Sequence, residues 1–320
     1  MKQHHQNSSL LNTSSFSECR CSKCNRLLFK GQVKYIEIQC PKCNVVQTIK
    51  KGRSLRLVAL NASNVDLFYA AGGQLVGRPD TMALSSDLME KIKDVPSIGE
   101  TPSPDIEQII ALKPDLVLAA DIHLHQSVLT SLEKAGIPMY IQRLNNCQQI
   151  SQALRFYGEL TNHPQQANLV IERLNSKLKQ AQERSRNKPS PRVLIVWGSV
   201  ESFYMAMPNS FTGDLIQHLN ATNVAKSTAG QEEQYIPLSL DFAVAANPDV
   251  ILLIPHSYEK KVNDKIRNEL LVHPAWHRLK AVQENRVHQL PYHLFAVNPG
   301  SRVDEAIDCL LELFYPDVLQ

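Results

Sequence analysis

The sequence predicts an α/β protein of two similar α/β lobes, joined by a long helix with a ligand cleft between them and preceded by a small four-cysteine module. Three observations predict this architecture. After Arg53, short apolar runs alternate with helical patterns, as they do in α/β domains. One phrase from the first half of the chain returns in the second half at a nearly constant offset. Four cysteines near the start form two CxxC pairs.

The paired cysteines give the most specific chemical signal. Cys21-x2-Cys24 and Cys40-x2-Cys43 are separated by fifteen residues. Each pair places two thiolates on one tight turn, and two such turns supply the four soft ligands of a tetrahedral zinc ion. A disulfide framework is the competing interpretation, which a fifth thiol beside the quartet and two distant single cysteines make less favourable. We therefore predict one structural zinc ion.

The stretch from Glu18 to Arg53 is basic. It holds nine Lys or Arg residues and two acids, which leaves 25 basic and 29 acidic residues for the rest of the chain. A small basic module is suited to a nucleic-acid backbone, RNA or DNA, or to another acidic surface. The competing interpretation is charge balance, because a zinc ion with four thiolates carries about two negative charges. The candidate nucleic-acid contacts are Lys23, Arg26, Lys30 and Lys42.

The start of the chain bears on the compartment. Residues 1–17 are polar and lack the apolar core and cleavage site of a secretory signal, so we expect a disordered tail. No run of eighteen apolar residues occurs, so we expect no membrane-spanning helix. Seven cysteines, four of them in a metal pattern, favour a reducing compartment. As written, the chain is expected in the cytoplasm. The alternative is an extracytoplasmic protein whose export signal is missing from this sequence.

Residues 54–146, which follow the module of residues 18–53, are predicted to form the first lobe. Its apolar runs have the length of buried strands, and the helical patterns between them end at Gly or Pro. Ser103 is expected to cap one helix, with Pro104 at its first position. The expected strands are Arg56–Leu60, Leu75–Gly77, Leu116–Ala119 and Met139–Ile141, and the other expected helices are Asn64–Ala71 and Ser127–Ala135.

A repeat predicts that the second lobe copies the first. Ile109–Leu118, which contains Lys-Pro-Asp before an apolar run, is echoed by Ala243–Leu252 at an offset of 134 residues. Arg192–Val196 matches the opening strand Arg56–Leu60 at an offset of 136 residues. Two phrases at nearly one offset argue for two similar lobes, the second over residues 189–320, instead of one continuous sheet.

Residues 147–188 are predicted to connect the lobes as a helix. Apolar residues keep helical spacing on both sides of Pro164, with charged residues between them. The segment Pro164–Arg186 contains 23 residues, a length of about 34 Å. Such a connector permits only limited bending between the lobes.

In a two-lobed α/β protein, ligands bind at the carboxyl ends of the strands. Aromatic groups there suit a flat or bulky conjugated ligand, and Arg78 suits a carboxylate or an anionic chelate, although each aromatic residue is also explained by packing. His123-x-His125 and His256-x-Tyr258 are able to ligate a metal, but surface solvation explains them as well. The candidate ligand-binding residues are Ser63, Asn64, Arg78, Trp197, Tyr204, Tyr235, His256, Tyr258, Tyr292 and Phe295.

Motifs of catalysis do not stand out. The sequence offers no nucleophile motif, glycine-rich phosphate loop or paired-carboxylate site, and Asn298–Ser301 is predicted to be a cap and turn before the last helix. We therefore expect a binding protein and not an enzyme.

The two lobes resemble the helical-backbone periplasmic binding proteins. The resemblance covers Arg56–Thr161 and Pro191–Pro316, and the repeated Pro-Asp phrases are its most specific part. It implies capture of an iron–siderophore, haem or cobalamin for an ABC importer. In that family an acidic residue on the outer rim of each lobe contacts the permease, which selects Glu107 and Asp241 here. The alternative for both acids is stabilisation of a helix N-terminus.

The front module is similar to the Com-type zinc fingers, small phage-derived regulators of translation or transcription. The matching residues are Arg20–Phe29 and Ile36–Cys43. Two functions follow as hypotheses. The first is a non-enzymatic binding protein for an iron chelate, haem or a corrinoid, and the second is a cytoplasmic nucleic-acid-binding regulator that senses such a ligand. A structural scaffold would require a closed or filled cleft.

The cysteine spacing makes a first testable prediction. The recombinant protein should carry one zinc ion per chain, and replacing Cys24 or Cys40 should release it, because a tetrahedral site that loses one of four thiolates binds zinc far more weakly. Elemental analysis checks the metal content. Cys19→Ser is the control and should keep the zinc if Cys21 is the ligand. Folded, metal-free protein with four reactive thiols in this module would contradict the assignment.

Overall fold

The computed structural model describes residues 18–21, 23–30, 35–39, 46–50, 55–226, 233–256 and 260–316. The chain divides into two compact units, Met1–Ser54 and Leu55–Gln320. The first corresponds to the predicted tail and cysteine module, and the second contains both predicted lobes. The predicted tail of residues 1–17, together with Cys40, Lys42 and Cys43, lies outside the described residues.

The first unit contains two short antiparallel strand pairs. They are β1 (Glu18–Arg20) with β2 (Leu27–Lys30), and β3 (Tyr35–Gln39) with β4 (Val46–Lys50). A tight turn joins β1 to β2, in which the Cys21 N–H donates to the Arg26 carbonyl at 2.8 Å and Asn25 adopts a positive φ of 54°. Cys21 and Cys24 therefore share one turn, as their spacing predicts, whereas Cys19 lies in β1 opposite Phe29.

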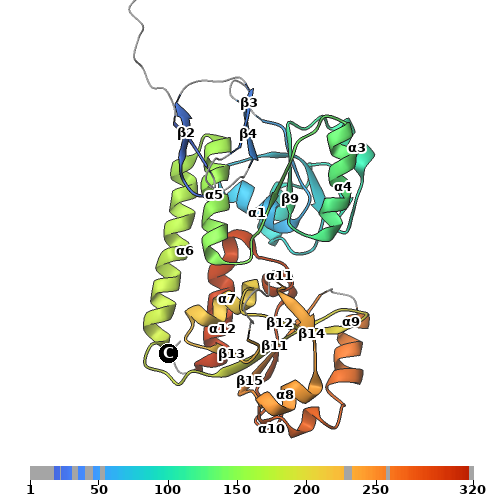
Figure 1. Ribbon diagram of the computed structural model, residues 1–320, viewed down its shortest axis with the longest axis vertical. Coiled ribbons are helices and arrows are strands. Elements are labelled where there is room, and N and C mark those ends of the chain that lie inside the picture. Colours follow the sequence, from blue (N-terminus) through green and yellow to red (C-terminus); the bar gives the residue numbers. More distant parts are fainter. Residues whose placement is uncertain are drawn as a thin grey trace, which may run out of the picture. The chain divides into compact units, whose positions relative to one another are not determined.

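The second unit begins with a lobe built on one twisted sheet (Figure 1). Its strands are parallel except for the last pair, which is antiparallel. In spatial order they are β10 (Met139–Gln142), β9 (Leu116–Ala120), β5 (Leu57–Ala59), β6 (Leu75–Asp80), β7 (Ser97–Glu100) and β8 (Ser103–Pro104). The helices of this lobe are α1 (Ala62–Ala70), α2 (Ser86–Lys91), α3 (Ile106–Ala111) and α4 (His123–Lys134).

The second lobe has a mixed sheet. The parallel strands β11, β15 and β16 form its core, and the antiparallel strands β12 and β14, which the sequence did not predict, extend it on one side. In spatial order the strands are β14 (Tyr235–Pro237), β12 (Phe203–Ala206), β11 (Arg192–Gly198), β15 (Val250–Pro255) and β16 (Val287–Gln289), and β13 (Thr222–Asn223) pairs with β11. The helices are α7 (Phe211–His218), α8 (Leu240–Ala246), α9 (Lys260–Lys265), the π-helix η1 (Ile266–Leu270), the 3-10 helix η2 (Trp276–Arg278), α10 (Lys280–Gln283), α11 (Tyr292–Phe295), the 3-10 helix η3 (Gly300–Arg302) and α12 (Val303–Phe314).

The predicted repeat is confirmed in its hydrogen bonds. In the first lobe the Asp115 carboxylate accepts the Arg56 N–H at 3.0 Å, and in the second the Asp249 carboxylate accepts the Arg192 N–H at 2.9 Å. The residues two before these aspartates, Lys113 and Asn247, both have positive φ angles, of 47° and 41°. Each Pro-Asp phrase thus turns the chain out of a helix and fixes the start of the central strand pair.

Strand alternation divides the interior of the second lobe into two faces. Along β11, Val193 and Ile195 belong to one buried cluster, whereas Leu194 and Val196 belong to another. The first cluster includes buried residues of α6, α7 and α12 and continues into the first lobe, whereas buried residues of α8, α9 and α10 belong to the second cluster. Both faces are covered, so these strands are continuously apolar, as expected for parallel strands between helical layers.

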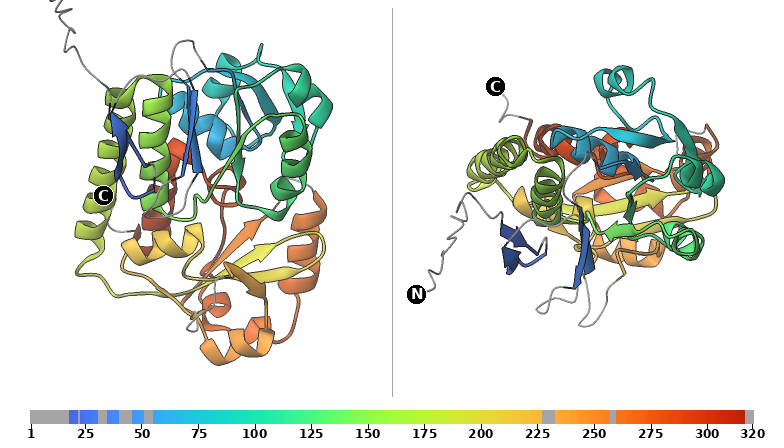
Figure 2. Two further views of the ribbon diagram at one scale, coloured as in Figure 1. Left: turned by 45° about the horizontal axis from the view of Figure 1, so that its top comes forward. Right: turned by 90° about the horizontal axis from the view of Figure 1, so that it is seen from above.

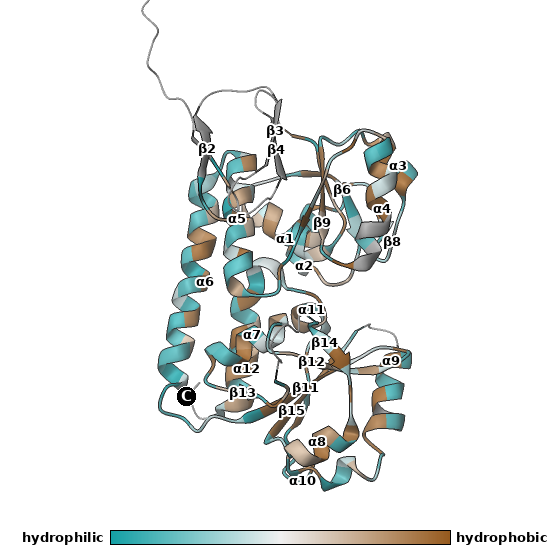
Figure 3. Cartoon of the chain, in the orientation of Figure 1, coloured by the Kyte–Doolittle hydropathy of each residue, from teal (hydrophilic) through white to brown (hydrophobic). Residues whose placement is uncertain are grey.

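The connecting segment is not one helix, contrary to the prediction for residues 147–188. It forms α5 (Cys147–Thr161) and α6 (Pro164–Ser185), because Asn162 adopts a left-handed conformation with φ 60° and Pro164 starts the next helix. Figures 1 and 2 show α5 and α6 side by side, with α6 running along both lobes. The outward face of α6 is largely hydrophilic (Figure 3). The stiff connector is therefore α6 alone, while α5 packs against α1 in the first lobe.

The chain also returns to the first lobe near its end. We call residues Leu290–Arg302, which follow β16 and contain α11 and η3, the inter-lobe segment. Asn298 donates to the Leu144 carbonyl at 2.7 Å, and the Ser301 N–H donates to Asp66 of α1 at 2.5 Å. The two lobes are thus tied at this segment as well as through α6.

The starts of α3 and α4 differ from the prediction, and α1 begins two residues before the predicted Asn64. Asp105, and not Ser103, caps α3, since its carboxylate accepts the Gln108 N–H at 2.9 Å and Ser103 lies in β8. Helix α4 begins at His123, four residues before the predicted start at Ser127. Among the described residues, no helix is long and apolar enough to cross a membrane.

The contact at Gly300 makes a second testable prediction. Gly300 has φ +67°, and a Cβ there would lie 2.4 Å from Asp66 Oδ1, so Gly300→Ala should lower the free energy of unfolding by about 3 kcal/mol. Gly136→Ala is the matched control. Gly136 has φ +70° but open space around its Cβ position, so it should lose only about 1 kcal/mol. Equal losses in denaturant unfolding would show that the contact contributes little.

Candidate functional site

Four rings from four neighbouring segments gather at the carboxyl edge of the second sheet. We call Trp197, Tyr204, Tyr235 and His256 the aromatic row. The centroid of the Trp197 ring lies 4.1 Å from that of His256, 5.3 Å from that of Tyr235 and 6.1 Å from that of Tyr204. The sequence predicted all four as ligand-binding residues, and the structure brings them together.

Strand register explains the row. Trp197 lies opposite Tyr204 in the antiparallel pair of β11 and β12, and opposite Ile254 in the parallel pair of β11 and β15. Side chains alternate along a strand, so His256, two residues after Ile254, returns to the face of Trp197. The His256 N–H donates to the Gly198 carbonyl at 2.8 Å, which extends the pairing one step beyond β15.

The polar atoms of the row are suited to a ligand. The Trp197 indole Nε1 is buried and has no hydrogen-bond partner among the described residues. Desolvation lowers the pKa of His256, so its imidazole is neutral at pH 7, which is the form that binds metals. Desolvation also raises the pKa of Tyr235 to about 12, so this phenol stays protonated. The row therefore offers apolar ring faces, one unpaired N–H donor and one neutral imidazole.

Two further predicted residues lie on α11 of the inter-lobe segment. This helix packs against β15. Phe295 is buried in the core, and Tyr292 is half-buried. Tyr258 lies outside the described residues, so its predicted role as a ligand contact or metal ligand stays a prediction.

Ser63 and Asn64, predicted as ligand contacts at the start of α1, have their hydrogen bonds inside the protein. Asn64 is fully buried, and its Oδ1 accepts from the Tyr157 hydroxyl at 2.9 Å and from Gln142 Nε2 at 2.5 Å. Ser63 is buried too, and its hydroxyl donates to the Asn298 carbonyl at 2.6 Å. Both side chains stabilise the lobe and its contact with the inter-lobe segment, a geometry that does not favour direct ligand contact.

Arg78 is also held by its own lobe. Its guanidinium donates to the carbonyls of Ile92 and Pro79, both at 3.3 Å, and lies 3.5 Å from the Asp80 carboxylate. The reason is that β6 continues through Pro79 to Asp80, beyond the predicted end at Gly77. Arg78 is therefore a residue of the strand and not of the loop at its carboxyl end.

One exposed residue just after this longer strand was not predicted from the sequence. Met82 lies in the loop after β6 and is 73% exposed, the largest exposure among the exposed large hydrophobic side chains of the described residues. Arg302 of η3 donates to the Ala83 carbonyl at 2.7 Å, which places this loop against the inter-lobe segment. From the sequence, Arg78 and Pro79 were placed at the end of this strand, and the residues after Asp80 were therefore not considered.

The predicted histidine pair at residues 123 and 125 does not form a surface loop. His125 is fully buried in the first turn of α4, and its Nδ1 accepts the Ala120 N–H at 3.0 Å. Burial lowers the pKa of His125, so it is a neutral internal acceptor. This hydrogen bond accounts for Nδ1, whereas Nε2 is buried and has no hydrogen-bond partner among the described residues.

The predicted docking acids occupy equivalent places in the two lobes. Glu107 lies in the first turn of α3 and Asp241 in the first turn of α8, and both are exposed. Each helix already has a side-chain cap, from Asp105 in α3 and from Ser239 in α8. Neither Glu107 nor Asp241 forms an ion pair with another described residue.

Two groups of side chains bear on metal binding. In the first unit Cys21 is buried and Cys24 half-buried on one turn, which is the arrangement that half of a four-thiolate zinc site needs. In the second unit the ligand atoms of Cys147, Asp214 and His218 lie within 4.8 Å of one another. Burial and the Asp214 carboxylate raise the pKa of the Cys147 thiol, which disfavours the thiolate that a metal would bind.

Residues 57–294 match the family described as "Periplasmic binding protein". The chain belongs to this family. The resemblance that the repeated phrases indicated is therefore confirmed, as are the two α/β lobes. The family consists of binding proteins and not of enzymes. Residues 15–57 match a second family, described as "Mu-like prophage protein Com", which confirms the resemblance of the front module.

Individual relatives carry more specific names. The chain is 28% identical over 244 residues to the "High-affinity heme uptake system protein IsdE" of Staphylococcus aureus strain MRSA252, covering 76% of this chain and 81% of that protein. The crystal structure of S. aureus IsdE complexed with heme matches with a TM-score of 0.74 and 26% identity, over 82% of this chain and 99% of that one. The siderophore binding protein BauB, bound to two acinetobactin molecules and ferric iron, shares the fold at 20% identity with a TM-score of 0.68, over 88% of this chain and 98% of that chain.

Proposed function

We propose that this periplasmic binding protein family member binds haem between its lobes and delivers it to an ABC permease. One observation carries the proposal: the neutral His256 imidazole, its ring centroid 4.1 Å from that of Trp197 and tilted by 43° to it, ends a row of aromatic rings at the carboxyl edge of the second sheet. A neutral imidazole is a usual axial ligand of haem iron, and aromatic rings suit the faces of the macrocycle. The relatives named for heme support the same ligand.

The first lobe offers a second group for the iron. Met82 exposes its thioether in the loop after β6, and a thioether paired with an imidazole is an established form of haem ligation. His256 follows a strand of the second lobe, so the two groups come from different lobes. We propose Met82 as the partner of His256, with the undescribed Tyr258 as the other candidate.

The repeat supports the proposal that the protein docks on a permease. Glu107 and Asp241 occupy equivalent exposed positions, one on each lobe, and neither is needed as a helix cap. Two carboxylates on rigid lobes with a limited hinge define a fixed spacing, which two basic pockets on a symmetric permease dimer are able to match. Delivery of this kind places the protein outside the cytoplasmic membrane.

Haem titration tests the proposal. The purified protein should bind hemin with a shifted, sharpened visible absorption band, and His256→Ala should weaken binding by more than about tenfold, because the iron loses an axial ligand. Met82→Leu should change the band position with a smaller loss of affinity. His277→Ala is the control, because His277 is an exposed histidine within η2, outside the aromatic row. It should match the wild type.

The same titration distinguishes haem from the other candidate ligands. If hemin fails to bind and a ferric siderophore or cobalamin binds with a dependence on Trp197, the site stands but the ligand is another metal chelate. If none of these probes binds, or if His256→Ala and His277→Ala behave alike, the proposal is wrong.

The front module supports a second candidate function, binding of nucleic acid. Its match to the Com family and its excess of cations favour this role. We propose that one zinc ion, held by Cys21, Cys24, Cys40 and Cys43, organises the module. Lys23 and Arg26 are exposed in and beside the turn that carries Cys21 and Cys24. In this role the protein would work in the cytoplasm as a regulator that senses its ligand.

Gel shifts with the full chain test the second function. Binding to RNA or DNA should weaken with salt, and reversing Arg26 and Lys30 to Glu together should lower the logarithmic salt slope by about two units, because each of the two cations neutralises one phosphate. The same reversal at Lys179 and Lys188, on and just after α6, is the charge-matched control. It should leave the slope unchanged, and zinc content should be equal in all variants. No shift at low salt would remove the regulator hypothesis.

A further inference from the structure

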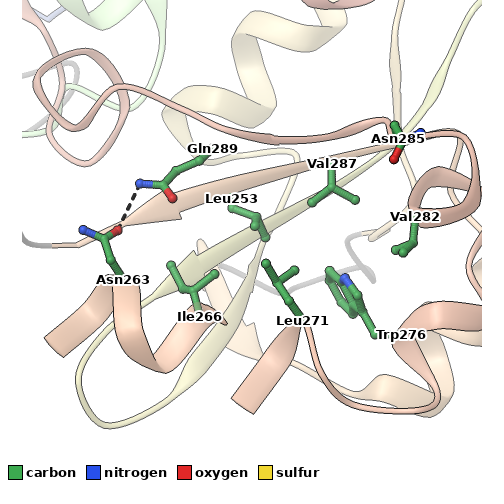
Figure 4. A pocket seen from close by; sticks show the side chains of 9 residues that line it. All are labelled: Leu253, Asn263, Ile266, Leu271, Trp276, Val282, Asn285, Val287 and Gln289. Atoms are coloured by element: carbon green, nitrogen blue, oxygen red, sulfur yellow. Dashed lines mark hydrogen bonds between the residues drawn. The ribbon is translucent and has the colours of Figure 1, made fainter. Parts of the chain in front are cut away.

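A pocket of about 690 Å³ lies in the second lobe, away from the aromatic row (Figure 4). This volume lies within the range of small-molecule sites. The pocket is formed where β15 and the edge strand β16 meet the π-helix η1, η2 and α10. Its lining residues are Leu253, Asn263, Ile266, Leu271, Trp276, Val282, Asn285, Val287 and Gln289.

The pocket and the aromatic row lie on opposite faces of the same sheet. Trp197 packs on the cluster that contains Val193 and Ile195, whereas Leu253 and Trp276 belong to the cluster on the other face. The pocket is therefore not part of the proposed haem site, and a ligand in it would not touch the aromatic row.

An unpaired donor indicates a ligand. Trp276 is 1% exposed, and its indole Nε1 has no hydrogen-bond partner among the described residues. In Figure 4 the nitrogen-bearing edge of the ring points towards Val287 and the other lining side chains. A buried N–H without an acceptor is unfavourable, and a ligand oxygen in the pocket would satisfy it.

The chemistry of the lining restricts the ligand. No lining residue carries a charge that could pair with a charged molecule. Five of the nine residues are Leu, Ile or Val, but polar groups contribute at least as much of the accessible wall, so the lining favours a neutral molecule that combines apolar and polar groups. Three amide side chains remain. Asn263 accepts a hydrogen bond from Gln289 at 3.0 Å, and Asn285 lies elsewhere on the lining (Figure 4). A neutral molecule with an apolar body and one carbonyl oxygen matches these groups.

The local backbone agrees with a binding role. The π-helix Ile266–Leu270 interrupts the regular helical pattern directly after α9, and Ile266 from it lines the pocket. Single π-turns of this kind occur frequently at functional sites, since they widen one side of a helix.

We propose that this pocket is a second binding site, for a neutral small molecule with an apolar body, whose carbonyl oxygen accepts a hydrogen bond from Trp276 Nε1. A bound ligand would fill the space between β16 and α10. The inference is independent of the haem proposal, because the two sites share no lining residue and lie on different sheet faces.

The two tryptophans make the test specific. The chain contains only Trp197 and Trp276, so protein labelled with ¹⁵N-tryptophan gives two indole N–H signals, and Trp197→Phe assigns them. The probes are 2-acetylnaphthalene and 2-ethylnaphthalene, which have similar shapes but differ in the carbonyl. We expect the ketone to shift the Trp276 signal and to bind about fivefold more tightly than the hydrocarbon, the gain of one net hydrogen bond.

Pocket-filling variants complete the experiment. Val287→Phe should abolish the ketone-induced shift, whereas Val272→Phe, which adds the same ring at an exposed position outside the lining, should leave it intact. The ligand pair tests the wild-type protein directly, so the proposal stays falsifiable if Val287→Phe fails to fold. It is overturned if the ketone leaves the Trp276 signal unchanged at its solubility limit, if it shifts only Trp197, or if both probes bind equally.

Discussion

The arrangement of the lobes depends on the contact between α1 and the inter-lobe segment. Asp66, on the first helix of the first lobe, accepts the Ser301 N–H, and Gly300 beside it has no room for a side chain. Burial raises the pKa of Asp66, while the hydrogen bond from Ser301 and the charge of Arg302 oppose this shift. Helix α6 connects the lobes once, and the inter-lobe segment connects them a second time. Because α12 starts from this segment and packs along α6, the two connections lie on the same side. Ion pairs from α6 to α12, Arg173 with Asp304 at 3.5 Å and Lys177 with Asp308 at 2.5 Å, add modestly to the same joint. Two packed crossings resist bending more than a single helix does.

Strand alternation then decides what each face of the second sheet can do. A shift of one residue in β11 would exchange Trp197 and Val196, and the aromatic row would move into the opposite core. The hydrogen bonds of Asp249 to the Arg192 backbone prevent such a shift at the strand's start. The Pro-Asp phrase therefore sets the register that places Trp197 beside His256, some five residues further along the strand.

The sequence was sufficient where short-range pattern and tertiary packing agree. The repeated phrases predicted both central strand pairs, and strand-end reasoning predicted all four residues of the aromatic row.

Prediction from the sequence failed where tertiary contacts override the local signal. Pro79 lies inside β6 and not after it, and Ser103 pairs in a strand while Asp105 caps the helix. Asn64 is a polar residue just after a strand, which suggested a ligand contact. Its side chain is instead buried and hydrogen-bonded to Gln142 and Tyr157, which are distant in sequence. The pocket at Trp276 had no local signal, because its lining comes from segments joined only in the fold.

The charges around the strand ends favour haem over a highly anionic chelate. Three arginines near the strand ends, among the described residues, are already engaged: Arg78 by backbone carbonyls and Asp80, Arg143 by Asp121 at 2.5 Å, and Arg302 by the carbonyls of Ala83 and His293. A ferric chelate of high negative charge would need several of them released, at the cost of the hydrogen bonds that hold the loops in place. Haem carries its charges on two flexible propionates that can remain in water, and in the proposed site its apolar macrocycle would meet neutral rings and its iron a neutral imidazole. The aromatic row would satisfy that division of charge without rearranging these three arginines, and this supports haem as the proposed ligand.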